Sequence, residues 1–254
     1  MITFKDLAKK TAPVLGIYMS FSDPLIVELA KAAGFDFIRI DYEHILFDYS
    51  ELKELIRTAT LLDMPCQVRV SNLHDVTKIL DCGALGIVVP DVNTVEKARE
   101  AIAATKMYPL GSRGQFPIGR FTRLAGCKTF QEYTQIANEI VTLNIQIEDV
   151  RAAKIIDEII SLPGIDMVSS GKGDISQSVG KPGQLTDPEV VNMENLIIKK
   201  ALEYKKIPIV LVSNKQSLQE KMALGEKFFT VNNDEVLLFN AFKNIVRELK
   251  NIKN

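Results

Sequence analysis

The stretch Ile38–Ile45 reads IRIDYEHI, an apolar segment that runs directly into two acids and a histidine. We interpret its first half as part of a β-strand over Phe37–Asp41. In a parallel α/β protein, side chains just past the carboxyl end of a strand face the region where ligands bind. His44 is one of only two histidines, and because imidazole titrates near neutral pH it is the candidate for proton transfer. In the alternative interpretation, Asp41 and Glu43 cap the next helix and His44 is structural.

Strand-like runs of the same kind recur along the chain with helix-like segments between them. The predicted strands are Val14–Met19, Phe37–Asp41, Cys66–Val70, Gly86–Pro90, Leu143–Ile147, Met167–Ser170, Pro208–Val212 and Phe228–Val231. The predicted helices are Pro24–Ala33 closing at Gly34, Ser50–Leu62 with Ser50 as N-cap, Val76–Asp81, Asn93 or Thr94 to Ala104, and Thr129–Glu139. Eight strands alternating with helices over about 250 residues indicate an α/β protein of the (β/α)8 TIM-barrel class.

A doubly wound open sheet is the alternative architecture. It is disfavoured because no Gly-x-Gly-x-x-Gly follows the first strand, and Gly171-Lys172-Gly173 after the sixth lacks the third glycine. No shift in composition marks a linker, so residues 1–254 are predicted to form a single domain. One segment, Tyr108–Cys127, breaks the alternation; it is rich in glycine and proline, carries Arg113 and Arg120, and is predicted to be a long functional loop.

Composition and charge favour a small-molecule partner. Hydrophobic residues make up 46% of the chain and charged residues 25%, and 31 basic and 32 acidic residues give a net charge of -1. Neither a nucleic-acid surface nor a membrane anchor is indicated. Met1–Ala12 does not resemble a secretory signal and no long apolar run is present, so we expect a cytoplasmic protein. Cys66, Cys82 and Cys127 are predicted to be free thiols, two of them within apolar segments.

In a barrel, polar residues from several strands would meet at the carboxyl end. Strand two supplies Asp41, Glu43 and His44, strand three Arg69, strand five Gln146 and Glu148, and strand six Asp174. Two carboxylates from adjacent strands suit a hard divalent ion, Mg²⁺ or Mn²⁺ with Co²⁺ as a further candidate, and leave positions for water and substrate oxygens. In the alternative interpretation, Glu148 and Asp174 are separately solvated loop acids.

An arginine beside such an ion suits a 2-oxo acid substrate, because the ion polarises the keto group. Arg69 would then hold the negative charge that develops on the keto oxygen when a proton leaves the adjacent carbon. His44 would be the base, either directly or through a metal-bound water, provided that a carboxylate fixes its tautomer. Asp81 is a candidate for that carboxylate, although taken alone it reads more simply as an acid at the C-terminal end of a helix.

Several segments, in the same order along the chain, carry a resemblance to one family. They are Gly34–Phe37, Ile40–His44, Val68–Val70, Leu80–Ala84, Val89–Val92, Tyr108-Pro109 with Gly111–Gly114, Ile145–Glu148, and Gly171–Ser176 before Gly180. On these residues the chain, from Gly16 to about Phe242, resembles the HpcH/HpaI aldolases. These are metal-dependent (class II) pyruvate aldolases that include 4-hydroxy-2-oxoheptanedioate and 2-keto-3-deoxy sugar acid aldolases.

The resemblance implies a barrel of the phosphoenolpyruvate superfamily, in which a 4-hydroxy-2-oxo acid is reversibly cleaved into pyruvate and an aldehyde. It implies that Glu148 and Asp174 are the metal ligands and that Arg69 clamps the keto oxygen. His44 with Asp81 would form the basic dyad. The backbone N–H groups of Gly173 and Asp174 would receive the pyruvate carboxylate, and Gln146 joins the substrate-binding set.

The resemblance also implies a homo-oligomer, a hexamer built as a trimer of dimers, in which the last helix is exchanged between subunits. The segment Asp234–Leu249 is amphipathic, which fits this exchange and equally fits docking onto its own barrel.

Two departures from the family pattern leave the second substrate open. The chain has Lys172-Gly173 where the family usually has Pro-Ala or Pro-Asn, which adds a cation beside the predicted metal site. It has Gln115, Phe116 and Pro117 where small residues are common. The main alternative is a citrate-synthase-like condensation of oxaloacetate with an acetyl thioester, or oxaloacetate decarboxylation. A barrel that binds keto acids without turnover, and a Schiff-base aldolase using Lys172, are further alternatives.

Overall fold

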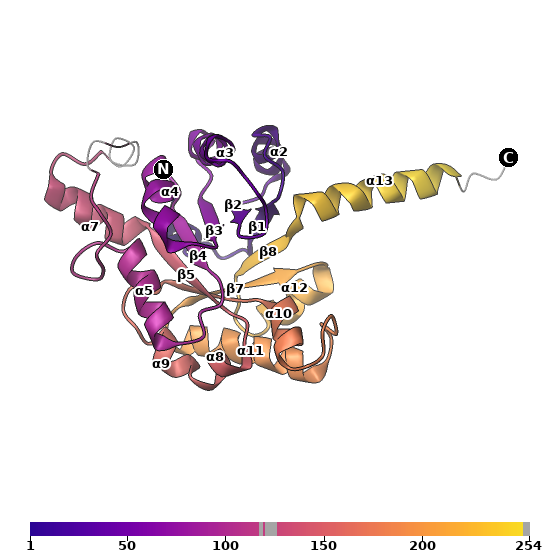
Figure 1. Cartoon of the computed structure of the whole chain (residues 1–254). Coiled ribbons are helices and arrows are strands. Elements are labelled where there is room, and N and C mark those ends of the chain that lie inside the picture. Colours follow the sequence, from indigo (N-terminus) through magenta and orange to yellow (C-terminus); the bar gives the residue numbers. More distant parts are fainter. Residues whose placement is uncertain (117–118, 120–125, 251–254) are drawn as a thin grey trace.

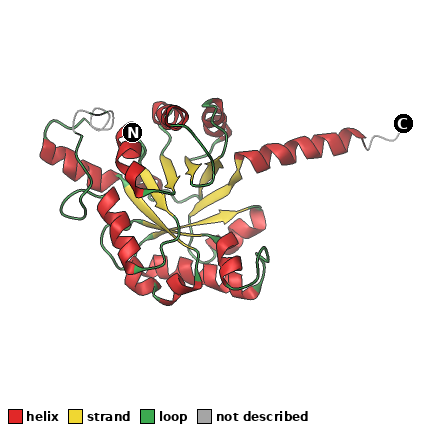
Figure 2. Cartoon of the chain, viewed as in Figure 1, coloured by secondary structure: helices red, strands yellow, loops and turns green. Residues whose placement is uncertain are grey.

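The computed structural model describes residues 1–116, 119 and 126–250, and eight parallel strands close there into a barrel in the order β1 to β8 (Figures 1 and 2). The strands are β1 Val14–Met19, β2 Phe37–Tyr42, β3 Cys66–Val70, β4 Gly86–Val89, β5 Thr142–Ile147, β6 Met167–Ser170, β7 Ile207–Val212 and β8 Phe228–Asn233. Pairing of β1 with β8 closes the barrel. The predicted TIM-barrel class is confirmed, and every predicted strand matches an observed one to within two residues at each end.

Helices cover the outside of the barrel (Figure 2). The helices of the described residues are α1 Phe4–Leu7, α2 Leu25–Ala33, α3 Tyr49–Leu61, α4 Val76–Cys82 after the 3₁₀ turn Leu73–Asp75, α5 Val95–Thr105, α7 Phe130–Ile140, α8 Val150–Lys154, α9 Ile156–Ile160, α10 Lys172–Ser178, α11 Pro188–Glu203, α12 Lys215–Met222 and α13 Asp234–Lys250. Helix α2 ends as predicted at Gly34, whose φ of 95° lies in the left-handed region that glycine tolerates.

The predicted start of helix α3 is wrong. Asp48, not Ser50, is the N-cap: its carboxylate accepts the backbone N–H groups of Ser50 and Glu51, both at 2.8 Å. Glu51 returns the contact by accepting the N–H of Asp48, which completes a capping box. The Asp-x-x-Glu spacing was present in the sequence, so the signal for the earlier start was available.

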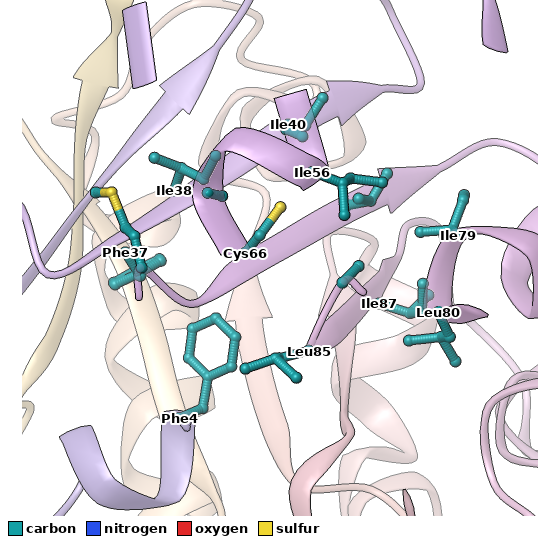
Figure 3. Close-up of a cluster of buried hydrophobic side chains, with 14 of the residues drawn as sticks. Phe4, Phe37, Ile38, Ile40, Ile56, Cys66, Ile79, Leu80, Leu85 and Ile87 are labelled. Atoms are coloured by element: carbon teal, nitrogen blue, oxygen red, sulfur yellow. The ribbon is translucent and has the colours of Figure 1, made fainter. Parts of the chain in front are cut away.

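The amino end of the barrel is closed by apolar packing. The ring of Phe4 on α1 meets the ring of Phe37 edge to face at a centroid distance of 5.5 Å, and Phe37 in turn contacts Phe228 of β8. Figure 3 shows Phe4 in one cluster with side chains from β2, β3, β4, α3 and α4. Gly16 leaves room for the Phe37 ring, because a Cβ on residue 16 would lie 2.2 Å from that ring. Burial of each such ring stabilises the fold by about 1.5–3 kcal/mol.

The last helix, α13, points away from the barrel (Figure 1). Its first residue anchors it, since the Asp234 carboxylate accepts the N–H groups of Ser20 and Phe21 beyond β1. Beyond that anchor, exposed apolar side chains line the helix: Val236, Leu238, Phe239, Phe242, Ile245, Val246 and Leu249. An apolar helix surface of this kind fits the predicted exchange between subunits, which stays a prediction.

Two smaller predictions concern the cysteines and the membrane. The three cysteines form no disulfide; Cys66 is buried, which raises the pKa of its thiol, whereas Cys82 and Cys127 are only partly buried. Among the described residues, no helix combines the length and apolarity needed to cross a bilayer.

Of the predicted loop arginines, Arg113 is described and Arg120 lies outside the described residues.

Candidate active site

Two adjoining cavities open at the carboxyl end of the barrel. The first has a volume of about 370 Å³ and the second about 400 Å³. Residues that line the first include Tyr18, Asp41, Arg69, Gln146, Lys172, Gly173 and Asp174; those of the second include Glu43, His44, Asp91, Glu148, Asp149 and Asp174. Asp174 belongs to both. The structure therefore brings together every predicted site residue except Asp81.

Arg69 is held rigidly by an acid from the neighbouring strand. Its Nε and Nη2 donate to the two carboxylate oxygens of Asp41 at 3.1 and 2.7 Å, and its Nε lies 3.2 Å from Glu43 Oε2. Burial raises the pKa of Asp41, but the hydrogen bond and charge of Arg69 outweigh it, so that this pKa is lowered and the pair is ionised. Such a bidentate contact fixes the plane of the guanidinium. Arg69 is thus oriented toward the first cavity without help from a ligand.

Glu148 is nearly buried and is positioned by three neighbours. Its Oε1 accepts the backbone N–H of Asp91 at 2.5 Å, and its Oε2 accepts Gln146 Nε2. Gly171, at the end of β6, passes so close that a Cβ there would lie 2.2 Å from Glu148 Oε2. Burial raises the pKa of Glu148 despite these donors, and the nearby negative charge of Asp174 raises it further. The surroundings of Glu148 therefore disfavour the ionised form of its carboxyl group.

The charges at this end of the barrel favour a bound cation. Six acids line the two cavities, and two of them, Asp91 and Asp149, pair with cations outside the cavities. The other four, Asp41, Glu43, Glu148 and Asp174, are left with the Arg69 guanidinium and the Lys172 ammonium group. Glu43 Oε2 is buried and accepts no hydrogen bond from the described residues, although Arg69 Nε lies 3.2 Å away, and burial raises the pKa of Glu43. A divalent ion between Glu148 and Asp174 would relieve this excess of negative charge. The residues present fit such an ion.

The donor set also restricts which ion fits. Among the described residues, no group of three or more histidine, cysteine or acidic side chains is arranged to hold a metal. Two carboxylates with open positions for water and substrate oxygens are what Mg²⁺ prefers, whereas a structural zinc site needs four protein ligands.

The structure does not bring the predicted dyad together within one chain. His44 is largely exposed at the rim of the second cavity, with Nε2 3.5 Å from Glu43 Oε2. Asp81 accepts Arg113 Nη2 at 2.8 Å, and burial raises the pKa of its carboxyl group. The pairing of His44 with Asp81 stays a prediction, and Glu43 is the carboxylate that contacts His44 among the described residues.

A buried arginine below the site was not anticipated. Arg39 is 1% exposed and lies two residues before Asp41, on the same inward face of β2. Its Nη1 donates to the hydroxyl of Tyr18 at 2.9 Å, and its Nε and Nη2 donate to Gln67 Oε1. The Tyr18 ring lies 5.2 Å from the Arg39 guanidinium and 5.4 Å from that of Arg69. The sequence contained the information needed to predict this position. Side chains two residues apart on a strand point to the same face, so Arg39 must share the face of Asp41.

Comparison with known proteins places this geometry in a family. Residues 15–241 match the HpcH/HpaI aldolase/citrate lyase family. The chain is 31% identical to a 4-hydroxy-2-oxo-heptane-1,7-dioate aldolase of Escherichia coli, with 94% of this chain and 91% of the relative covered. It is 29% identical to a 2-keto-3-deoxy-L-rhamnonate aldolase of Escherichia coli O9:H4, with 99% and 94% covered.

Among solved structures, the crystal structure of the citrate synthase SbnG superposes with a TM-score of 0.90 at 28% identity and covers 98% of both chains. The family match spans most of the chain and includes the residues that meet at the carboxyl end of the barrel. The protein belongs to the HpcH/HpaI aldolase/citrate lyase family.

Proposed function

We propose that the protein is a divalent-metal-dependent aldolase that reversibly cleaves a 4-hydroxy-2-oxo acid into pyruvate and an aldehyde. The observation that carries this proposal is the Arg69 guanidinium, fixed by Asp41 and facing the same cavity as Asp174. The similar proteins that are named as aldolases support this reaction class for the chain. A divalent ion held by Glu148 and Asp174 would polarise the keto group of the substrate as a Lewis acid.

The residues of this chain would bind pyruvate by its two polar ends. Arg69, which lines the first cavity, would donate to the keto oxygen and stabilise the negative charge that develops there. The N–H groups of Gly173 and Asp174 lie in the first turn of α10, where backbone donors have no partner within the helix, and would receive the carboxylate. Gly173 borders open space, since a Cβ there would meet nothing within 4 Å.

Proton transfer would fall to His44. In the condensing direction, its imidazole removes a proton from the pyruvate methyl group, and the electron pair left on carbon forms the enolate, whose oxygen faces Arg69. The enolate carbon then attacks the aldehyde carbon, and the new alkoxide takes up the proton that His44 had removed. Cleavage runs through the same steps in reverse. Glu43, in contact with His44, and Asp81, the partner implied by the family, are the two candidates to orient the imidazole.

The first test is exchange of the pyruvate methyl protons with deuterium, followed by proton NMR with Mg²⁺ and with EDTA. This assay needs no knowledge of the aldehyde. We expect exchange with Mg²⁺ and none with EDTA. A folded, metal-loaded protein that gives no exchange would refute the proposal that pyruvate is the nucleophile.

A citrate-synthase-like reaction is the second candidate, because SbnG is similar along nearly its whole length. In that reaction an acetyl thioester supplies the nucleophilic carbon and oxaloacetate the electrophilic keto group. Release of free thiol that requires both oxaloacetate and acetyl-CoA would favour this candidate. Loss of CO₂ from oxaloacetate alone would instead indicate decarboxylation.

We also propose that the protein assembles as a hexamer in which α13 packs on a neighbouring subunit. The exposed apolar residues of α13 support this proposal. Light scattering should give six times the 28.3 kDa chain mass, and a change of Phe239 and Phe242 to serine should lower it. A monomer in solution would refute the assembly.

A further inference from the structure

The cavity has a second cation, Lys172, on the side reached by α10. Lys172 is the first residue of that helix, lines the cavity that contains Arg69, and is about one-quarter exposed. Its ammonium nitrogen lies 3.2 Å from Glu194 Oε2 on the neighbouring helix α11 (Figure 1).

Glu194 does not depend on Lys172 for its neutralisation. It is 1% exposed, and the ammonium group of Lys221 on α12 lies 2.5 Å from the same oxygen, Oε2. The Ser170 hydroxyl donates to the other oxygen of Glu194 at 3.3 Å. If Lys172 moved away, the buried carboxylate would keep one full counter-charge and one hydrogen bond. A buried acid that loses its only partner would be far more costly.

The cluster as a whole carries an excess of positive charge. Two ammonium groups, those of Lys172 and Lys221, share the single carboxylate of Glu194. Glu226 lies close enough to this cluster to sense its charges, but burial raises its pKa well above normal and favours the neutral form. Lys172 is therefore the more weakly held of two cations, with a flexible four-carbon stem that ends beside a ligand cavity.

We infer that Lys172 determines the second substrate by exchanging Glu194 for an anionic group at the end of the aldehyde remote from its carbonyl. The preferred 4-hydroxy-2-oxo acid would then be one with a carboxylate at each end. This inference rests on the proposed aldolase function and assigns the acceptor class of that same site. Arg69 and the backbone N–H groups of Gly173 and Asp174 serve pyruvate, whereas the side chain of Lys172 serves the acceptor.

The test compares two aldehydes of equal length, 4-oxobutanoate and butanal, as acceptors for pyruvate. The quantity measured is the ratio of kcat/KM for the charged aldehyde to that for the neutral one. In Lys172→Met, which keeps the length of the side chain without its charge, we expect this ratio to fall about tenfold or more, as for loss of a charge-assisted hydrogen bond. Lys172→Arg should retain the preference.

Two further variants provide a second removal of the charge and a control. Lys172→Pro also removes the charge, at a first helical position that tolerates proline, and should lower the ratio in the same way if the methionine variant does not fold. Lys200→Met is the matched control: Lys200 lies on α11 like Glu194 but pairs with Asp157, so the ratio should not change.

The outcomes separate the two proposals. Wild-type protein that fails to exchange the pyruvate methyl protons would overturn the aldolase function. Normal exchange and condensation with an unchanged ratio in the charge-removing variants would overturn the role of Lys172. A rise in KM for pyruvate with an unchanged ratio would also overturn it, because Lys172 would then serve the pyruvate carboxylate.

Discussion

At the amino end of the barrel, Lys106 lies 2.6 Å from Asp166, and the pair is enclosed by backbone partners. Lys106 also donates to the carbonyl oxygen of Val141, and Asp166 accepts the N–H of Leu143. At the carboxyl end, Asp41 and Glu43 instead share the Arg69 guanidinium, while Glu148 and Asp174 form no ion pair among the described residues. Where each charged group has a partner within the protein, as at the amino end, the pair serves the fold. Where acids outnumber bases around a cavity, as at the carboxyl end, the site is suited to a ligand.

The largest effect is expected from Arg69→Lys. A lysine keeps the positive charge but cannot make the two-point contact with Asp41 that fixes the donor direction. We expect deuterium exchange of pyruvate to slow about 100- to 1,000-fold, with a similar free energy of unfolding. Arg57→Lys, on the outer helix α3, is the control and should retain full exchange. An exchange rate within a few-fold of the parent rate would contradict this contrast between the two ends, because the site at the carboxyl end would then not depend on a fixed guanidinium.

The second prediction concerns the glycine beside Glu148. In Gly171→Ala the new methyl group would collide with the Glu148 carboxylate, so we expect affinity for Mg²⁺ or Mn²⁺ to fall about 10- to 100-fold. Gly173→Ala, two residues on, adds the same methyl group to open space and should bind the ion as the parent does. Titration calorimetry measures both. Equal affinities in the two variants would mean that the position of Glu148 does not matter for the ion.

The third prediction moves to the amino end. Lys106→Met leaves Asp166 without its ion-pair partner, and we expect the free energy of unfolding to fall by about 2–4 kcal/mol in urea titrations. Pyruvate exchange by the folded variant should be unchanged. Lys78→Met removes an exposed lysine paired with Asp75 and should have almost no effect on stability. Lost exchange in folded Lys106→Met would show that the two ends are not independent.

The smallest effect is expected at Asp6, whose carboxylate closes the capping box of α1. Hydrogen bonds from Lys9 and Thr3 lower the pKa of Asp6 from 3.8 to about 2. Because the folded-state pKa is depressed, the stabilisation is fully present above pH 4 and is lost as pH falls toward 2. Asp6→Asn should therefore lower the free energy of unfolding by less than about 1 kcal/mol at pH 7, since solvent screens the contact. Urea titrations should show this difference shrinking below pH 4; a difference independent of pH would contradict the assignment.

The strands could be predicted from the sequence because each is a short apolar run that ends at a polar residue. Val14–Met19, Cys66–Val70 and Met167–Ser170 have the predicted bounds. Parallel strands in a barrel bring their carboxyl ends together, so the meeting of Arg69 with Asp174 followed from the order of elements alone.

Side-chain pairing could not be predicted in the same way, because it depends on loops and on helices distant in sequence. Asp81 contacts Arg113 across a separation of 32 residues, and Arg113 lies in the described part of the chain that follows α5. Lys172 was recognised as an extra cation, but its pairing with Glu194 depends on how α10 packs on α11. Nothing in the local sequence of either segment encodes these contacts.

The most direct test of the account is a titration of Mn²⁺ followed by electron paramagnetic resonance, with Mg²⁺ as competitor. We expect one ion per chain in the parent protein and none in Glu148→Gln or Asp174→Asn. Asp149→Asn is the matched control: this acid borders the same cavity, but Arg151 neutralises it at 2.6 Å, so its affinity should stay within about fivefold of the parent. Full binding by folded Glu148→Gln would contradict the claim that the unbalanced acids at the carboxyl end of the barrel are there to hold a metal ion.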